Sequence, residues 1–168
     1  MVEKVRIIGI DPGLRRCGWG VIEAAGNRLS FLACGVVSPP VKEALPERLA
    51  YLFAAVGALV REWAPDEAAV EETFVNQGER SALLLGQARG VVLMTPASMG
   101  LPVAEYAANL IKKSVVGAGH ADKSQVQAMV RLLLPQADVS KVDAADALAI
   151  AICHAHHRSH RSLMAASA

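Results

Sequence analysis

Three strand-like segments lie within the first 38 residues, and the connections between them are too short to hold a helix. They are the apolar stretches Val5–Ile10, Gly18–Glu23 and Ser30–Ser38. Residues 11–13, with the sequence Asp-Pro-Gly, follow the first stretch, and a Gly-Asn pair at 26–27 precedes the third; both are turn signals. Because strands joined by such short connections pair antiparallel, we expect the chain to begin with an antiparallel sheet of three strands.

The rest of the chain alternates between helical and strand-like patterns. Apolar residues recur at three- and four-residue steps across Ala44–Trp63, which predicts an amphipathic helix that ends before Pro65. Asp122 is the expected N-cap of a later helix, with Gln125 in the capping-box position. The other expected elements are a strand at Ala68–Glu71, a helix at Arg80–Thr95, a strand at Pro102–Ala107 and a last helix at Val142–His156.

These elements predict an α/β fold. The fourth and fifth strands are each reached through a helix, so they are expected to be parallel. The result is a mixed five-stranded sheet, three antiparallel strands followed by two parallel ones, flanked by helices. The 168 residues show no internal repeat or boundary, which predicts a single domain over residues 1–157. Residues 158–168 have no clear periodicity, which predicts a flexible C-terminal tail.

Composition excludes several classes of protein. Hydrophobic residues make up 53% of the chain and charged residues 20%, which excludes a disordered tail protein. A formal net charge of +1 excludes a binder that is basic over its whole surface. The three cysteines form no CxxC pair and favour reduced thiols over a disulfide framework. Since neither a membrane-spanning run nor a signal peptide is evident, we expect a cytoplasmic protein with no membrane association.

Four acidic residues stand where a stable fold has little need of them. Asp11 ends the first strand, Glu71 ends the fourth, and Asp143 and Asp146 share one face of the last helix. If the first and fourth strands are neighbours, the four carboxylates can meet in one pocket. Clustered carboxylates repel one another, and a hard divalent cation such as Mg²⁺ removes that cost. Two such ions can activate a water and stabilise the leaving oxygen in phosphodiester hydrolysis.

Structural alternatives exist for three of these acids. Asp11 precedes a Pro-Gly pair and could bond its own backbone in a turn. Glu71 stands beside Glu72, and either could be a solvated surface charge. Asp143 lies three residues after Ser140 and fits a capping box. Asp146 is harder to explain structurally, because the helix around it is built of alanine and leucine.

Six stretches of the chain resemble the RuvC family of Holliday-junction resolvases. They are IIGIDPGLRRCGWGVIE, PDEAAVEETF, SALLLGQARGVV, PVAEYAANLIKKSVVG, ADKSQVQAMVR and DAADALAIAICH, and they cover nearly the whole chain in the family's order. The resemblance implies a ribonuclease-H-like fold and paired, symmetric nicking of four-way DNA junctions by a homodimer, in recombination and repair. It further implies that Asp11, Glu71, Asp143 and Asp146 form the catalytic, metal-binding tetrad. The expected cofactor is Mg²⁺, two ions per active site with Mn²⁺ as an alternative, and the expected partner is the RuvA–RuvB branch-migration complex.

The resemblance also implies DNA contacts. The family's conserved lysines match Lys112 and Lys123, and its loop aromatic, a base-stacking or strand-opening residue, matches Phe74. Lys123 falls in the first turn of a helix, where free backbone amides favour a phosphate. Arg80 is a candidate for contact with the junction backbone. Between residues 80 and 131 there are six basic and two acidic residues, which is consistent with a basic surface there. The alternatives are solvated lysines, a loop aromatic packed on the core and an exposed arginine.

Four further interpretations come from the residues. A histidine-rich segment that follows Cys153 lacks zinc spacing and is expected to be a surface cluster; its histidines are His154, His156, His157 and His160. The leucine-rich helix Arg80–Thr95 is the candidate dimer surface. One rival function is a nucleotide-binding protein of the actin and sugar-kinase type, although the chain is short for two such halves. The other is a junction-binding module without catalytic activity.

Overall fold

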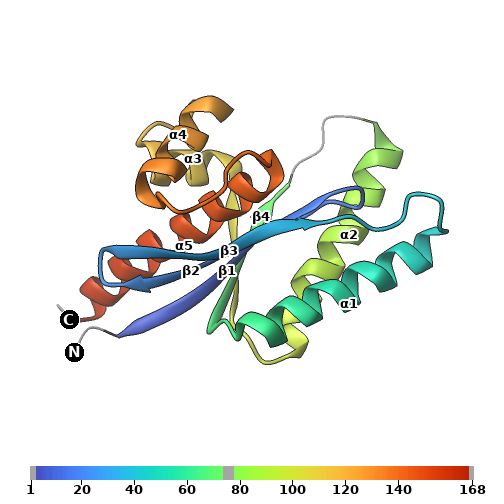
Figure 1. Cartoon of the computed structure of the whole chain (residues 1–168), viewed down its shortest axis with the longest axis horizontal. Helices are drawn as coiled ribbons and strands as arrows, with labels where there is room; N and C mark the ends of the chain where they lie inside the picture. Colours follow the sequence, from blue (N-terminus) through green and yellow to red (C-terminus); the bar gives the residue numbers. More distant parts are fainter. Residues whose placement is uncertain (1–2, 74–77, 167–168) are drawn as a thin grey trace.

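The computed structural model describes residues 3–73 and 78–166, and it is built around one five-stranded sheet (Figure 1). The strands are β1 (Lys4–Asp11), β2 (Cys17–Ala25), β3 (Arg28–Val37), β4 (Glu67–Glu72) and β5 (Val103–Ala107). Their order is β3-β2-β1-β4-β5. The pairs β1–β2 and β2–β3 are antiparallel, whereas β1–β4 and β4–β5 are parallel. The predicted mixed sheet is therefore confirmed.

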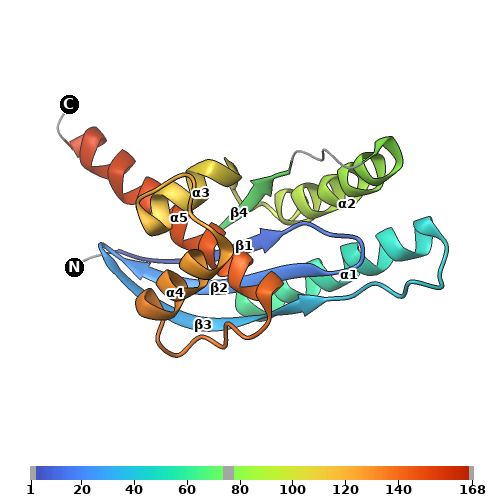
Figure 2. The same ribbon diagram turned by 90° about the horizontal axis from the view of Figure 1, so that it is seen from above.

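Helices cover both faces of this sheet. On one face lie α1 (Leu45–Trp63) and α2 (Glu79–Ser98); on the other lie α3 (Ala108–Val116), α4 (Lys123–Leu133) and α5 (Val142–Ala166). Figures 1 and 2 show the two layers from directions at right angles. The alternation of side chains along β1 explains the two hydrophobic cores, because Ile7 packs in the α5 core and Ile8 in the α1 core. Both side chains are fully buried.

The helix α5 lies unusually close to the sheet. A Cβ atom added to Gly9 of β1 would overlap the carbonyl oxygen of Ala147, and one added to Gly18 of β2 would overlap that of Asp143. The sheet-facing residues from Ala144 to Ala155 are almost all buried, and most of them are alanines. Small residues on both sides thus allow the start of α5 to reach the ends of β1 and β2.

The structure differs from the predicted elements at two places, a helix that was not predicted and the end of the last helix. The helix α3 was not predicted, because it follows β5 directly with Ala107 as an N-cap that makes no side-chain hydrogen bond. The residue that caps its C-terminus is Gly117, whose φ of 90° lies in the left-handed region that favours glycine. The last helix begins at Val142 as predicted but continues to Ala166, so its predicted end at His156 was wrong. A flexible tail at 158–168 and the single domain at 1–157 stay predictions. None of the described helices is long and apolar enough to cross a membrane.

Candidate active site

Three acidic side chains from three elements line one cavity. Asp11 is the last residue of β1, Glu71 lies near the end of β4, and Asp146 lies in the second turn of α5. The parallel pairing of β1 with β4 places Ile10 beside Val70, so the next residue on each strand is an acid of this group. The cavity has a volume of about 280 Å³. Besides the acids it is lined by Ala108, Ile111, Lys112, Lys123, Val126, Ala149 and Ile150.

The electrostatics of the cavity favour a bound positive charge. Burial raises the pKa of Asp11 to about 8, and the negative charges of Glu71, Asp146 and Asp143 add to the effect. Asp11 also shares a hydrogen bond with Glu71, which favours the protonated form of Asp11. Burial likewise raises the pKa values of Glu71 and Asp146. Ionising all of these acids in a poorly solvated space is therefore unfavourable, and a bound cation would offset the repulsion between their negative charges.

Two lysines supply part of the compensating charge. Lys123 Nζ lies 3.5 Å from Oδ2 of Asp146, and its charge lowers the pKa of that carboxyl against the effect of burial. Lys112 lines the same cavity from α3. Lys123 is the first residue of α4, and the predicted capping box of Asp122 and Gln125 is present just before and after it. The cap fixes the start of α4, and with it the backbone position of Lys123.

The fourth acid lies beside the cavity. Asp143 is not among its lining residues, yet its charge raises the pKa values of Asp11 and Asp146. Its side chain forms an ion pair with Arg16, whose Nε lies 3.5 Å from Oδ2. Arg16 was not singled out from the sequence, because nothing in the turn after β1 indicates that it faces α5. Of the four expected acids, the structure thus gathers three around one space and places the fourth next to them.

The carboxylate oxygens of these acids are suitable ligands for a hard divalent cation. Carboxylate oxygens are the ligands that Mg²⁺ and Mn²⁺ take, and three carboxyl groups share this cavity. In the described parts of the chain, no three Asp, Glu, His or Cys side chains already converge on a single ion position. Asp11 and Glu71 bond each other, and Asp146 is engaged by Lys123. An entering ion would take the place of the proton on Asp11 and of these two contacts.

The remaining predicted site residues lie elsewhere. Arg80 is exposed in the first turn of α2 and does not line the cavity. Phe74 lies outside the described residues. The expectation of a surface histidine cluster was wrong for His154, which is only 3% exposed, and for Cys153, which is fully buried. The signal was helical periodicity: His154 stands four residues after Ile150 and eight after Asp146, on the sheet-facing side of α5.

Comparison with known proteins identifies the family of this chain. The family model described as "Crossover junction endodeoxyribonuclease RuvC" matches residues 7–154. A protein of that name from Maricaulis maris (strain MCS10) is 61% identical over 167 residues, covering 99% of this chain and 100% of the relative. Another, from Rhodopseudomonas palustris (strain BisA53), is 60% identical over 156 residues, covering 93% and 90% of the two chains.

Solved structures agree with the sequence comparisons. Thermus thermophilus RuvC, solved in complex with a Holliday junction substrate, superposes with a TM-score of 0.87 at 33% identity, covering 94% of this chain and 96% of that one. The yeast mitochondrial Holliday junction resolvase Ydc2, at 13% identity and a TM-score of 0.64, shares the fold. These findings do not favour the actin-type or non-catalytic alternatives. The predicted ribonuclease-H-like fold is confirmed, and the chain belongs to the RuvC family of crossover junction endodeoxyribonucleases.

Proposed function

We propose that this protein is a structure-selective endonuclease that resolves four-way (Holliday) DNA junctions by paired, symmetric nicks, in recombination and repair. The observation that carries the proposal is the cavity at the ends of β1 and β4, where Asp11, Glu71 and Asp146 meet beside Lys112 and Lys123. Relatives about 60% identical over nearly the whole chain carry the name of that activity. Oxygen ligands beside basic groups are what hydrolysis of a phosphodiester requires.

Asp11, Glu71 and Asp146 would hold the ions, and Asp143 would complete the set once it leaves Arg16. The chemistry supplied by two bound Mg²⁺ ions, or by Mn²⁺ in their place, is activation of a water molecule and stabilisation of the leaving 3′ oxygen. Asp11 is central to this arrangement, because Glu71, Asp146 and Asp143 all act on its charge. Its carboxylate would therefore contribute most to holding the ions.

The lysines act on the phosphate. Lys112 and Lys123 line the cavity from two helices and can donate to oxygens of the scissile phosphate. The first backbone amides of α4 begin at Lys123 and favour an anion at the same place. The apolar walls at Ile111, Val126 and Ile150 reduce the solvation of the cavity on that side, which strengthens both effects. The products expected are a 5′ phosphate and a 3′ hydroxyl.

Further contacts with the junction stay proposals. We assign Phe74 to base stacking or strand opening, and Arg80 to the DNA backbone near the start of α2. The family also implies a partnership with the RuvA–RuvB branch-migration complex. The expected cytoplasmic location also stays a proposal.

A homodimer suits this substrate, because two matched sites can cut two like strands. The exposed side of α2 offers a surface for it. Leu83 is 63% exposed and Met94 is 53% exposed, and both share one side of the helix with Gly86 and Gly90. A Cβ atom added to either glycine would meet no other atom within 4 Å. An apolar stripe with small residues at its centre permits close approach of a second helix.

The test of this proposal is cleavage of a synthetic four-way junction, with and without divalent metal, beside a linear duplex of the same sequence. We expect paired nicks in the junction that require Mg²⁺ or Mn²⁺, and little cutting of the duplex. The Asp146→Asn variant should bind the junction and leave it intact. Undiminished nicking by that variant would refute the site, and metal-supplemented wild-type protein that binds without cutting would support the non-catalytic alternative.

A further inference from the structure

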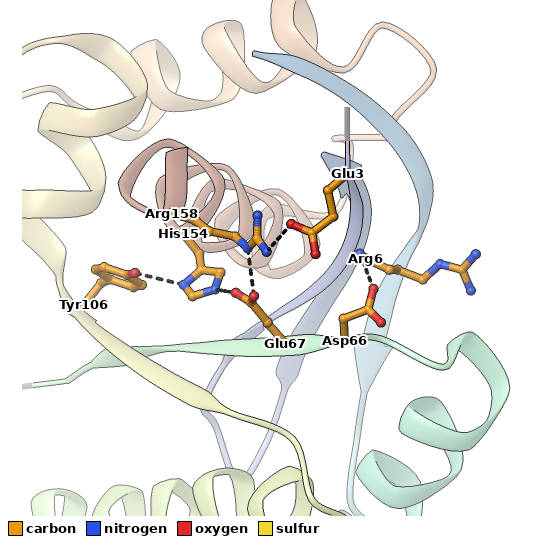
Figure 3. A network of polar contacts seen from close by, with 7 residues as sticks. All are labelled: Glu3, Arg6, Asp66, Glu67, Tyr106, His154 and Arg158. Carbon is orange, nitrogen blue, oxygen red and sulfur yellow. Dashed lines mark hydrogen bonds and ion pairs between the residues drawn. The ribbon is translucent and has the colours of Figure 1, made fainter. Parts of the chain in front are cut away.

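A polar network with a buried histidine at its centre joins α5 to the sheet at the end opposite the active site (Figure 3). His154 of α5 lies between two partners: its Nδ1 is 2.8 Å from the hydroxyl of Tyr106 on β5, and its Nε2 is 2.6 Å from Oε2 of Glu67 on β4. Its side chain is 4% exposed. Each ring nitrogen therefore faces a directional partner on a different strand, inside the packed layer between helix and sheet.

The carboxylate of Glu67 is held from a second side. Arg158, one turn further along α5, donates from Nε to Oε1 of Glu67 at 2.8 Å, and it also pairs with Glu3 at 3.1 Å. Burial alone would raise the pKa of Glu67, but the hydrogen bonds from Arg158 and His154 outweigh it and the pKa lies below its usual value. Glu67 is thus an ionised anchor at the first residue of β4. The same end of β4 is tied to β1 by the Arg6 amide, which donates to Asp66.

The distance between the two acids on β4 is close to the distance between Asp146 and His154 on α5. Glu67 and Glu71 are four residues apart on β4, so their side chains point to the same face about 13 Å apart. His154 and Asp146 are eight residues apart on α5, which is about 12 Å along the same side of the helix. The helix runs opposite to the strand, so His154 meets Glu67 at one end and Asp146 meets Glu71 at the other.

The packing between these two ends is apolar. Ala147 and Ala151 of α5 lie on Gly9, and the backbone of Asp143 lies on Gly18, which lets the helix approach the sheet; the larger side chains buried along the helix, Leu148, Ile150 and Ile152, are all apolar. Van der Waals packing of small residues depends little on direction, whereas a hydrogen bond weakens steeply when its geometry changes. A slide or rotation of α5 would distort the two hydrogen bonds of His154, which apolar contacts cannot replace.

We infer that the network of Glu67, His154 and Tyr106 is a positioning device that fixes α5 along β4 and thereby sets Asp146 opposite Glu71. This inference rests on the proposed function of the cavity. His154 does not line the cavity; it would act through the helix that it shares with Asp146. A displacement of about 1 Å at a reacting centre can cost about 100-fold in rate.

The test compares two replacements of His154 in the full-length protein. Glutamine keeps a donor and an acceptor and can still bridge Tyr106 and Glu67, whereas phenylalanine fills the volume without either bond. The readouts are the dissociation constant for Mn²⁺ alone, measured by electron paramagnetic resonance on metal-free protein, then kcat and the dissociation constant for the junction. Leu52→Ala serves as the control, because Leu52 is fully buried in the core on the opposite face.

We expect His154→Phe to weaken Mn²⁺ binding and lower kcat by about tenfold or more, with junction binding unchanged. His154→Gln should lie closer to wild type, and Tyr106→Phe, which loses one bond, should shift both quantities about threefold. If His154→Phe does not fold, the other two variants decide. If His154 only fills space, His154→Phe should resemble wild type more closely than His154→Gln does. Alternatively, the His154 variants would lower thermal stability, like Leu52→Ala, and leave Mn²⁺ binding and kcat unchanged. Either result overturns the inference.

One further variant separates this inference from the proposed function. Asp146→Asn should abolish both cleavage and the tight Mn²⁺ binding. If it does so while the His154 variants match wild type, the positioning role fails and the site stands. If Asp146→Asn leaves both intact, the site itself is wrong.

Discussion

Asp11 shows how a single side chain can be unfavourable for folding and still suit a site. Its pKa is raised from 3.8 to about 8, chiefly by burial and then by the neighbouring acids. The sequence singled out this residue through its place at the end of an apolar strand and the family motif around it, and its metal-binding role stays a prediction. It could not predict the degree of burial, which depends on how closely α5 packs over the strand ends.

This pKa gives a stability prediction for the metal-free protein. Between pH 4 and pH 8 the folded state keeps a proton on Asp11 that the unfolded chain releases, so the free energy of unfolding falls as pH rises through this window. Asp11→Asn removes the titrating group, and at pH 8.5 it should stabilise the metal-free protein by about 2 kcal/mol relative to wild type. Urea unfolding in EDTA at pH 5 and 8.5 measures this.

The control for that measurement is Asp138→Asn. The pKa of Asp138 is lowered by its hydrogen bonds to Ser140, so this carboxylate stabilises the fold above its unfolded pKa and loses that contribution as pH falls. Asp138→Asn should therefore bring no gain at high pH. If Asp11→Asn behaved in the same way, the carboxyl cluster would not carry the electrostatic cost described above.

Lys123 gives a second prediction at the scale of one residue. Lys123→Ala removes the cation 3.5 Å from Asp146 and the donor nearest the proposed phosphate position, so kcat should fall about 100-fold with little change in junction affinity. Lys113→Ala is the matched control, since Lys113 is exposed and does not line the cavity. Single-turnover cleavage measures both variants. Equal effects of the two changes would show that Lys123 contributes only as a general basic surface charge.

At the scale of elements, sequence patterns predicted most of the helices and strands. The strands and α1 followed from periodicity and turn residues, and α4 followed from the capping box of Asp122 and Gln125. The helix α3 was missed because it starts directly after β5 without a capping side chain, although it carries Lys112 into the cavity. The burial of His154 was missed because the histidines were judged as one group rather than by the side of the helix that each occupies.

The close packing of α5 gives the prediction for this scale. Gly18→Ala places a Cβ against the backbone carbonyl of Asp143, and backbone cannot yield as a side chain can. We expect a loss of about 1–3 kcal/mol in unfolding free energy, together with lower cleavage activity from displacement of the start of α5. Gly57→Ala in α1 is the control: its nearest contact would be the flexible end of Arg61 at 3.4 Å, and alanine favours helix. Equal stability and activity of the two variants would contradict this account of α5.

At the scale of the whole molecule, the strand order explains why distant residues meet. The antiparallel start, β1 to β3, leaves one edge of β1 free for β4, and this pairing brings residues 11 and 71 together. The sequence predicted which strands are antiparallel and which are parallel, but the neighbour of β1 depends on helices packing on both faces. The proposed association of two chains is harder to predict from the sequence, because it depends on which side of α2 stays exposed.

The proposed dimer makes its own prediction. Leu83→Asp places a charge on the apolar stripe of α2, so it should shift sedimentation to the monomer and replace paired cuts by single nicks. Leu132→Asp on α4 is the control, because Leu132 is 69% exposed on the other face of the sheet. A Leu83→Asp protein that still sediments as wild type, or a wild-type protein that is monomeric while it cuts, would exclude α2 as the shared surface.

The central claim is that acids from β1, β4 and α5 hold the ions that cleave DNA. The most direct measurement is the anomalous diffraction of crystals soaked in Mn²⁺ under conditions in which the protein cleaves junctions. We predict anomalous peaks within coordination distance of carboxylate oxygens of Asp11, Glu71 and Asp146, and their loss in Asp146→Asn. Manganese bound only elsewhere, in a protein that remains active in the same buffer, would contradict the claim.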